Sequence, residues 1–190
     1  GGFSQPTPAD FLYRLLPAQE TLARTHPEQL DNRFRLGMAY RWNNDQRHMI
    51  ETFESLLNDI PTDRKTPRTE ALLQLAWSRI NKVAWNRILH DPDSVRAYED
   101  AQASSALAEL PLDKFLAEYT MAYSMIFMPD YGDKSQMLRH LTEAKRWFDD
   151  IPGKDDEVWR FFLHSDLLKA VLDADPMFQP ILAAAQKPLS

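Results

Sequence analysis

The sequence contains no cysteine and only five glycines among its 190 residues. The absence of cysteine excludes disulfide bonds, thiolate nucleophiles and zinc sites built on thiolates. The few glycines leave no glycine-rich loop, so neither a Walker phosphate loop nor a dinucleotide-binding fingerprint is present. The chain also lacks Asn-Gly and Asp-Gly pairs and any sustained alternation of apolar and polar residues, so no β-hairpin is predicted.

Long apolar runs and a basic surface are missing as well. No stretch of about 18 apolar residues occurs, so we expect no membrane span. The net charge is −6 with acidic and basic residues interspersed, which argues against a nucleic-acid-binding protein. The chain begins Gly1-Gly2-Phe3 without an initiator methionine, as a processed product would. This beginning and the lack of cysteine favour a periplasmic or envelope-associated location, although a cytoplasmic fragment fits the same features.

Apolar residues recur at spacings of three and four along most of the chain, which is the pattern of amphipathic helices. Prolines and short polar segments separate these stretches. We therefore predict a single all-α domain over residues 1–190, built from antiparallel helix pairs. Its expected segments are a loose tail at 1–9, helix pairs at about 27–61, 67–111 and 112–152, and terminal helices over 155–186. We expect these terminal helices to be one helix at about 155–172 and a short capping helix at 177–185.

The clearest of these pairs runs from Leu30 to Pro61, and its first helix contains Gly37. A glycine in the middle of a helix costs roughly 1 kcal/mol relative to alanine. It is retained where another helix approaches so closely that a β-carbon would clash. Gly37 therefore predicts close contact between the two helices of this pair.

Short recurring sequence patterns indicate that the helix pair is repeated. The residues Pro61, Pro111 and Pro152 each close the second helix of a predicted pair. The tripeptide Met-Ala-Tyr occurs at 38–40 and again at 121–123, each time in a first helix. The separation of 34 residues between Pro27 and Pro61 is the period of the tetratricopeptide repeat.

The segment from 30 to 62 resembles a tetratricopeptide repeat residue by residue. The matching residues are Leu36, Gly37, Tyr40, Phe53 and Pro61. It departs from the family at Arg33, where tryptophan is frequent, and at Met49 and Leu56, where small residues are usual. The resemblance implies a short right-handed α-solenoid, in which the first helices line a concave groove for an extended peptide or a partner helix.

Carrying the family's inward positions onto this chain gives a set of candidate partner-binding residues. They are Asp31, Phe34, Met38, Arg41, Trp42, Trp77, Met121 and Met125. A surface rich in methionine and tryptophan adapts to apolar segments, because methionine is flexible and polarizable. The competing interpretation is that methionine and tryptophan at helical spacing belong to the core.

Other constellations give little support for catalysis. The pairs His48–Glu51 and His140–Glu143 are each three residues apart and share a helix face, so they could bind a metal only if they converged with further carboxylates. Solvated neighbours on a helix surface are the simpler interpretation. The serines lack a Gly-x-Ser-x-Gly elbow, so a serine hydrolase is not expected. We predict no catalytic residues, no metal and no cofactor.

The sequence favours a non-enzymatic protein–protein interaction module or scaffold that binds a protein or peptide partner in its groove. Self-association through the same surface is an alternative use of that groove. A second hypothesis is a small acidic helical inhibitor or immunity-type protein that masks a partner's active site, with strongly salt-dependent association. A third is a helical enzyme with a metal or carboxylate site between its helices.

Overall fold

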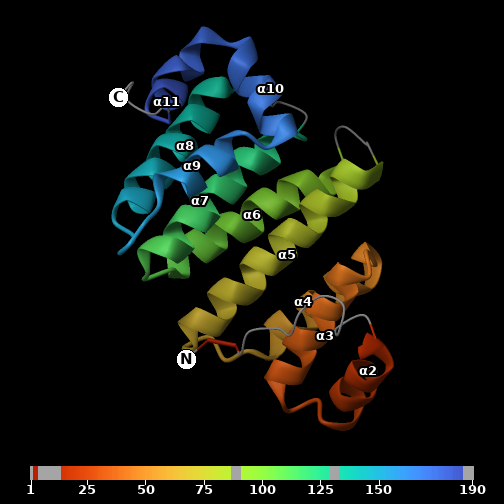
Figure 1. Ribbon diagram of the computed structural model, residues 1–190. Helices are drawn as coiled ribbons and strands as arrows, with labels where there is room; N and C mark the ends of the chain where they lie inside the picture. The colour runs from red at the N-terminus through yellow and green to blue at the C-terminus, as the bar shows by residue number, and fades with distance from the viewer. Residues whose placement is uncertain (1, 4–13, 87–90, 129–132, 186–190) are drawn as a thin grey trace.

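The chain folds into helices joined by short turns (Figure 1). The computed structural model describes residues 2–3, 14–86, 91–128 and 133–185, and within these ranges there is no β-strand. Across the same ranges, no helix combines the length and the apolar content that a membrane span requires. The predicted all-α class is therefore confirmed.

The helices follow one another along the chain with few residues between them. Their bounds are α2 (Leu16–Thr25), α3 (Leu30–Trp42), α4 (Gln46–Asp59), α5 (Lys65–Asn86), α6 (Pro92–Leu107), α7 (Pro111–Met125), α8 (Lys134–Asp149), α9 (Asp156–Leu163), α10 (Asp166–Ala174), the 3-10 helix η1 (Pro176–Phe178) and α11 (Gln179–Ala183). Aspartates begin several of them. For example, the side chain of Asp45 accepts a hydrogen bond from the backbone N–H of His48 at the start of α4.

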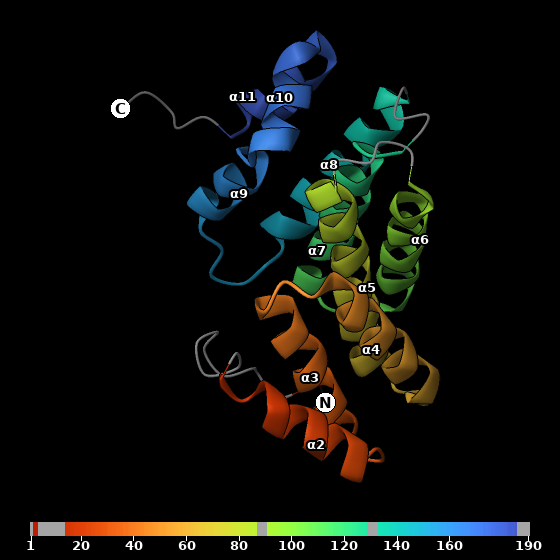
Figure 2. The same cartoon turned by 90° about the vertical axis from the view of Figure 1, so that its right-hand side faces the viewer.

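Each helix from α3 to α8 packs against the helix before it, and α5 also contacts α7. The colours of Figures 1 and 2 change steadily from α2–α4 at one end of the molecule to α9–α11 at the other. Neighbours in sequence are therefore neighbours in space. The packed pairs α3–α4, α5–α6 and α7–α8 correspond to the three predicted pairs.

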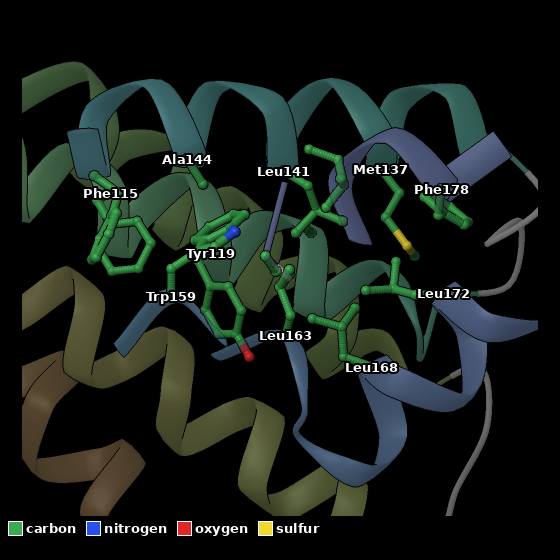
Figure 3. Packing of buried hydrophobic residues seen from close by; sticks show 14 of the residues in the cluster. Phe115, Tyr119, Met137, Leu141, Ala144, Trp159, Leu163, Leu168, Leu172 and Phe178 are labelled. Carbon is green, nitrogen blue, oxygen red and sulfur yellow. The ribbon is translucent and has the colours of Figure 1, made fainter. Parts of the chain in front are cut away.

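Three apolar clusters form the interior along this stack. The first joins α3, α4 and the beginning of α5, and the second joins α5, α6 and α7. The third joins α7 and α8 to the C-terminal helices. Figure 3 shows Trp159 and Leu163 of α9 turned into the same core as Leu168 and Leu172 of α10. The C-terminal helices thus complete the core of the last pair, with Phe178 of η1 fully buried.

Gly37 has the close neighbour that the sequence predicts. A β-carbon on Gly37 would lie 2.6 Å from Cζ of Phe53, which belongs to α4. Real β-carbons do not approach other carbon atoms so closely. The glycine is therefore required by the packing of α3 on α4.

Three segments differ from their predicted form. The single helix expected from 155 to 172 is divided at His164 and Ser165 into α9 and α10. The reason is visible in the apolar spacing, because Leu163 is followed by Leu168 after five residues, and a straight helix would turn Leu168 away from the core. The terminal helix expected at 177–185 is a 3-10 turn followed by α11. Residue 186, where the predicted terminal region ends, lies outside the described residues.

The third difference concerns the N-terminal tail. The ring of Phe3 stacks on Phe34 with 4.3 Å between the ring centroids. The backbone N–H of Phe3 donates to Oε2 of Glu70 at 3.1 Å. Residue 3 is thus packed on the first apolar cluster instead of lying loose, while positions 4–9 of the predicted tail lie outside the described residues.

Candidate functional site

Half of the predicted partner-binding residues lie inside the protein. Phe34 and Met38 of α3 belong to the first apolar cluster, and Met121 and Met125 of α7 belong to the other two. All four side chains are buried. In each helix the two residues are four positions apart, so they share the stripe that faces the neighbouring helices. They are packing residues, and this placement corrects their assignment to a groove.

The other four predicted residues reach the surface to different extents. Trp42 at the end of α3 is 49% exposed. The guanidinium of Arg41 donates to Oε1 of Gln74 at 2.7 Å, which ties α3 to α5, and its carbon lies 5.9 Å from the ring centroid of Trp42. Trp77 of α5 is half-buried, and Asp31 forms an ion pair with Arg35 on its own helix.

Contacts between aromatic rings continue from Trp77 of α5 to helices α7 and α9. The ring of Trp77 lies 5.4 Å from Tyr123 and 6.3 Å from Tyr119, both on α7. Tyr119 contacts Phe162 of α9 edge to face at 4.7 Å, and its hydroxyl donates to the carbonyl of Phe162 at 2.9 Å. Burial raises the pKa of Tyr119 to about 12, so this hydroxyl stays a hydrogen-bond donor at neutral pH.

We call this set the aromatic row, and it crosses α3, α5, α7 and α9. Its members are the contacting rings Trp77, Tyr119, Tyr123, Phe161 and Phe162, together with Trp42, which lies beside Arg41 at the end of α3. Figure 2 shows α3, α7 and α9 to the left of α4 and α6. The row ends at Phe161, which is 77% exposed. Of these members, the sequence predicted only Trp42 and Trp77. It missed Tyr119 and Tyr123 of α7 and the two members on α9, although the adjacent Phe161-Phe162 pair was a visible signal.

The histidines have partners other than those considered from the sequence. Nδ1 of His140 lies 2.7 Å from Oε2 of Glu118, and its Nε2 lies 2.8 Å from the hydroxyl of Tyr98. Glu143 pairs instead with Arg146, and His48 pairs with Asp45. The two His–Glu pairs do not converge, and the described part of the chain contains no group of three or more potential metal ligands.

A buried charged cluster joins α4, α5 and α6. The guanidinium of Arg79 donates to Glu54 at 2.6 Å and to Asp100 at 3.0 Å, with Asp93 at 3.4 Å. Lys82 also binds Asp93. Burial raises the pKa of Asp100 in spite of Arg79. These residues are far apart in the sequence, so no local pattern signalled the cluster, and its geometry is that of a tie between helices.

Comparisons of this chain with models of protein families, with curated proteins and with solved structures find no match. The site is therefore described by its own geometry. Of the features above, the aromatic row is the one that exposes large apolar side chains at both of its ends.

Proposed function

We propose that this chain is a non-enzymatic protein-interaction module, similar to a tetratricopeptide array, that binds a peptide or partner protein across α3, α5, α7 and α9. The observation that carries the proposal is the aromatic row. Its interior is fixed by contacts between helices, and its two ends, Trp42 and Phe161, are left at the surface.

The composition of the row fits a binding surface. Tryptophan, tyrosine and arginine are the residues that most often dominate the free energy of protein association. Trp77, Tyr123 and Phe162 are half-buried and held by neighbouring rings, so little side-chain freedom remains to be lost on binding. Arg41 adds a cationic group beside Trp42, at the α3 end of the row.

The polar side chains of His140 and Arg79 support an interaction role, because their bonds already join helices of the fold. His140 is engaged by Tyr98 and Glu118, which belong to two other helices. Arg79 is engaged by carboxylates from α4 and α6. Both groups join neighbouring helices of the stack, and their hydrogen-bonding partners lie within the protein.

The test begins with peptides selected against the intact protein from a random library displayed on phage. The dissociation constant of the tightest peptide is then measured by fluorescence anisotropy for the wild type, Trp42→Ala and Phe161→Ala. Trp85→Ala is the matched control, because Trp85 is 69% exposed at the end of α5 and lies outside the row.

We expect each row variant to bind about tenfold more weakly or worse, which is the range for interface hot spots. The control should bind like the wild type, and far-UV circular dichroism should be the same for all four proteins. Full binding by both row variants, or an equal loss in Trp85→Ala, would contradict the proposal.

A further inference from the structure

Residues 2–3, which we call the Gly-Phe segment, are packed on two helices that are far from them in the sequence. Figure 1 shows these residues, in red, beside the beginning of α5. The ring of Phe3 stacks on Phe34 of α3, with 4.3 Å between the centroids and 10° between the ring planes. The backbone N–H of Phe3 donates to Oε2 of Glu70, which belongs to α5. The Gly-Phe segment is thus held by one aromatic ring and one carboxylate.

Both contacts are of the kind by which proteins bind short peptides. A stacked aromatic side chain supplies a large apolar contact area with a defined geometry. A carboxylate that accepts from a backbone N–H fixes the position of the main chain, and every residue except proline can donate this bond. A segment of another protein with an aromatic residue at this position can therefore make the same two contacts.

Glu70 also selects the residue that precedes the aromatic one. A β-carbon added to Gly2 would collide with Oε1 of Glu70. A larger residue would push the carboxylate aside and disturb its hydrogen bond to Phe3. The site therefore favours a glycine followed by an aromatic residue.

Phe34 keeps its place through contacts beyond the Gly-Phe segment. Its ring meets Phe53 of α4 edge to face, with 5.7 Å between the centroids, and both rings belong to the first apolar cluster. Phe34 is only 6% exposed with the ring of Phe3 stacked on it. Departure of Phe3 would uncover part of Phe34, while Phe53 would still hold the ring in position. The platform on which Phe3 stacks is thus built by the helices themselves.

The platform lies on the face of α5 that carries the aromatic row. Glu70, Gln74 and Trp77 follow one another at spacings of four and three residues, so they share one stripe of the helix. Trp77 is a member of the row, and Gln74 accepts from Arg41 at the end of α3. The Gly-Phe segment therefore covers part of the surface proposed for peptide binding.

A second carboxylate makes the surroundings of the Gly-Phe segment acidic. Asp113, in the first turn of α7, is near enough for its charge to act on Glu70. Burial raises the pKa of both groups, and among the described residues no basic side chain offsets this effect on either of them. A cationic group beside the segment would be attracted to these carboxylates, whereas an anionic group would be repelled.

We propose that the Gly-Phe segment fills a peptide site of its own chain, and that a partner segment of the form basic residue, glycine, aromatic residue takes its place. The inference rests on the proposed binding of peptides by this face. Because the chain's own segment is tethered to the site, it competes at an effective concentration on the order of millimolar. The partner must displace it, so the segment sets the affinity at which the site responds.

The experiment is an NMR titration of the ¹⁵N-labelled intact protein with acetyl-Lys-Gly-Phe-amide. Phe3→Ala removes the competing ring and leaves every helix unchanged. We expect this variant to bind the peptide about three- to tenfold more tightly than the wild type, because a site that is already filled in most molecules has a lower apparent affinity. The amide signals that shift should be those of α3 around Phe34 and of α5 around Glu70.

The acidic surroundings are tested with a second peptide, acetyl-Glu-Gly-Phe-amide, in the Phe3→Ala background. The lysine peptide should bind more tightly than the glutamate peptide. Adding Glu70→Gln keeps the size of the side chain but removes its charge, so this preference should fall by about two- to fivefold, the range for a single exposed ion pair. Asp173→Asn is the matched control, because Asp173 pairs with Lys169 on α10, at the other end of the molecule.

Equal affinity of the wild type and Phe3→Ala for the lysine peptide, or no binding to either protein, would overturn the proposal. Equal binding of the two peptides to Phe3→Ala would overturn it as well. None of these variants removes a side chain of the aromatic row. Failure of the two tripeptides therefore removes the self-filled site alone, whereas the proposed function fails if the phage-selected peptide does not depend on Trp42 and Phe161.

Discussion

The ring of Phe53 occupies the space beside Gly37 that a side chain would need. A β-carbon at residue 37 would lie 2.6, 2.8 and 2.9 Å from three carbon atoms of that ring. Phe53 is completely buried, so its ring cannot turn out to solvent. The closeness of α3 and α4 therefore depends on this pair of residues.

Replacing Gly37 by alanine should destabilise the protein. Alanine gains roughly 1 kcal/mol in helix propensity over glycine. Overpacking a well-filled core costs about 1–3 kcal/mol or more, and the contact with Phe53 is severe enough for this cost to exceed the gain. Urea denaturation followed by circular dichroism gives the change in the free energy of unfolding. A variant more stable than the wild type would contradict the assigned contact.

A double-mutant cycle separates this contact from other effects of the substitution. Phe53→Leu alone should destabilise by leaving a cavity. In the double variant Gly37→Ala, Phe53→Leu, the smaller side chain makes room for the new methyl group. We expect the double variant to lose less stability than the sum of the two single losses, and strict additivity would argue against direct contact.

The Gly37 contact could be predicted because it belongs to one helix pair, whose pattern is local. The same periodicity predicted the helices and the packing of adjacent pairs. It could not tell which side of α3 faces solvent. Phe34 and Met38 fit a groove and a core equally well by spacing, and only the position of α4 and α5 decides that they are buried.

Asp93 provides a prediction about pH. Burial acts to raise its pKa, but the hydrogen bond and charge of Lys82, together with the charges of Arg79 and Arg96, hold the pKa below the ordinary value of 3.8. A carboxyl whose pKa is lowered in the folded state adds stability at pH above 3.8. That stability is lost as the pH falls through the folded-state pKa.

Asp93→Asn should therefore lower the free energy of unfolding by about 1–3 kcal/mol at neutral pH, because it removes one carboxylate partner from the buried Arg79 and from the partly exposed Lys82. The gap between wild type and variant should stay constant on acidification to about pH 4 and narrow below it. Urea denaturation across this range tests the prediction, and a gap that persists unchanged near pH 3 would refute it.

Tyr98 provides a test of the link between α6 and α8. With Nδ1–H of His140 donating to Glu118, its Nε2 accepts from the Tyr98 hydroxyl. Tyr98→Phe leaves that buried nitrogen without a donor and should cost about 1–3 kcal/mol. Tyr40→Phe is the control, because the Tyr40 hydroxyl makes an exposed bond to Glu20 at 3.3 Å. Urea denaturation measures the free energy of unfolding of both variants. Equal losses of stability would contradict a stabilising role for the hydrogen bond between Tyr98 and His140.

Contacts between residues far apart in the sequence, such as these, could not be predicted from the sequence. Arg79 meets carboxylates 25 residues before it and 21 after it, and His140 meets Glu118 at a separation of 22. Helical periodicity says which residues share a face of one helix. It does not say how neighbouring helices are rotated against each other, and that rotation decides which charges meet. The members of the aromatic row on α7 and α9 escaped prediction for the same reason.

The most direct test of the interaction face is an NMR titration that follows the indole N–H signals of the five tryptophans. The unlabelled peptide selected by phage display is added to the ¹⁵N-labelled intact protein. Binding across the row should shift the signals of Trp42 and Trp77, which belong to it. The signals of Trp85, exposed at the end of α5, and of Trp147, on α8, should stay in place. Shifts confined to Trp85 and Trp147, with Trp42 and Trp77 unchanged at saturation, would contradict the account.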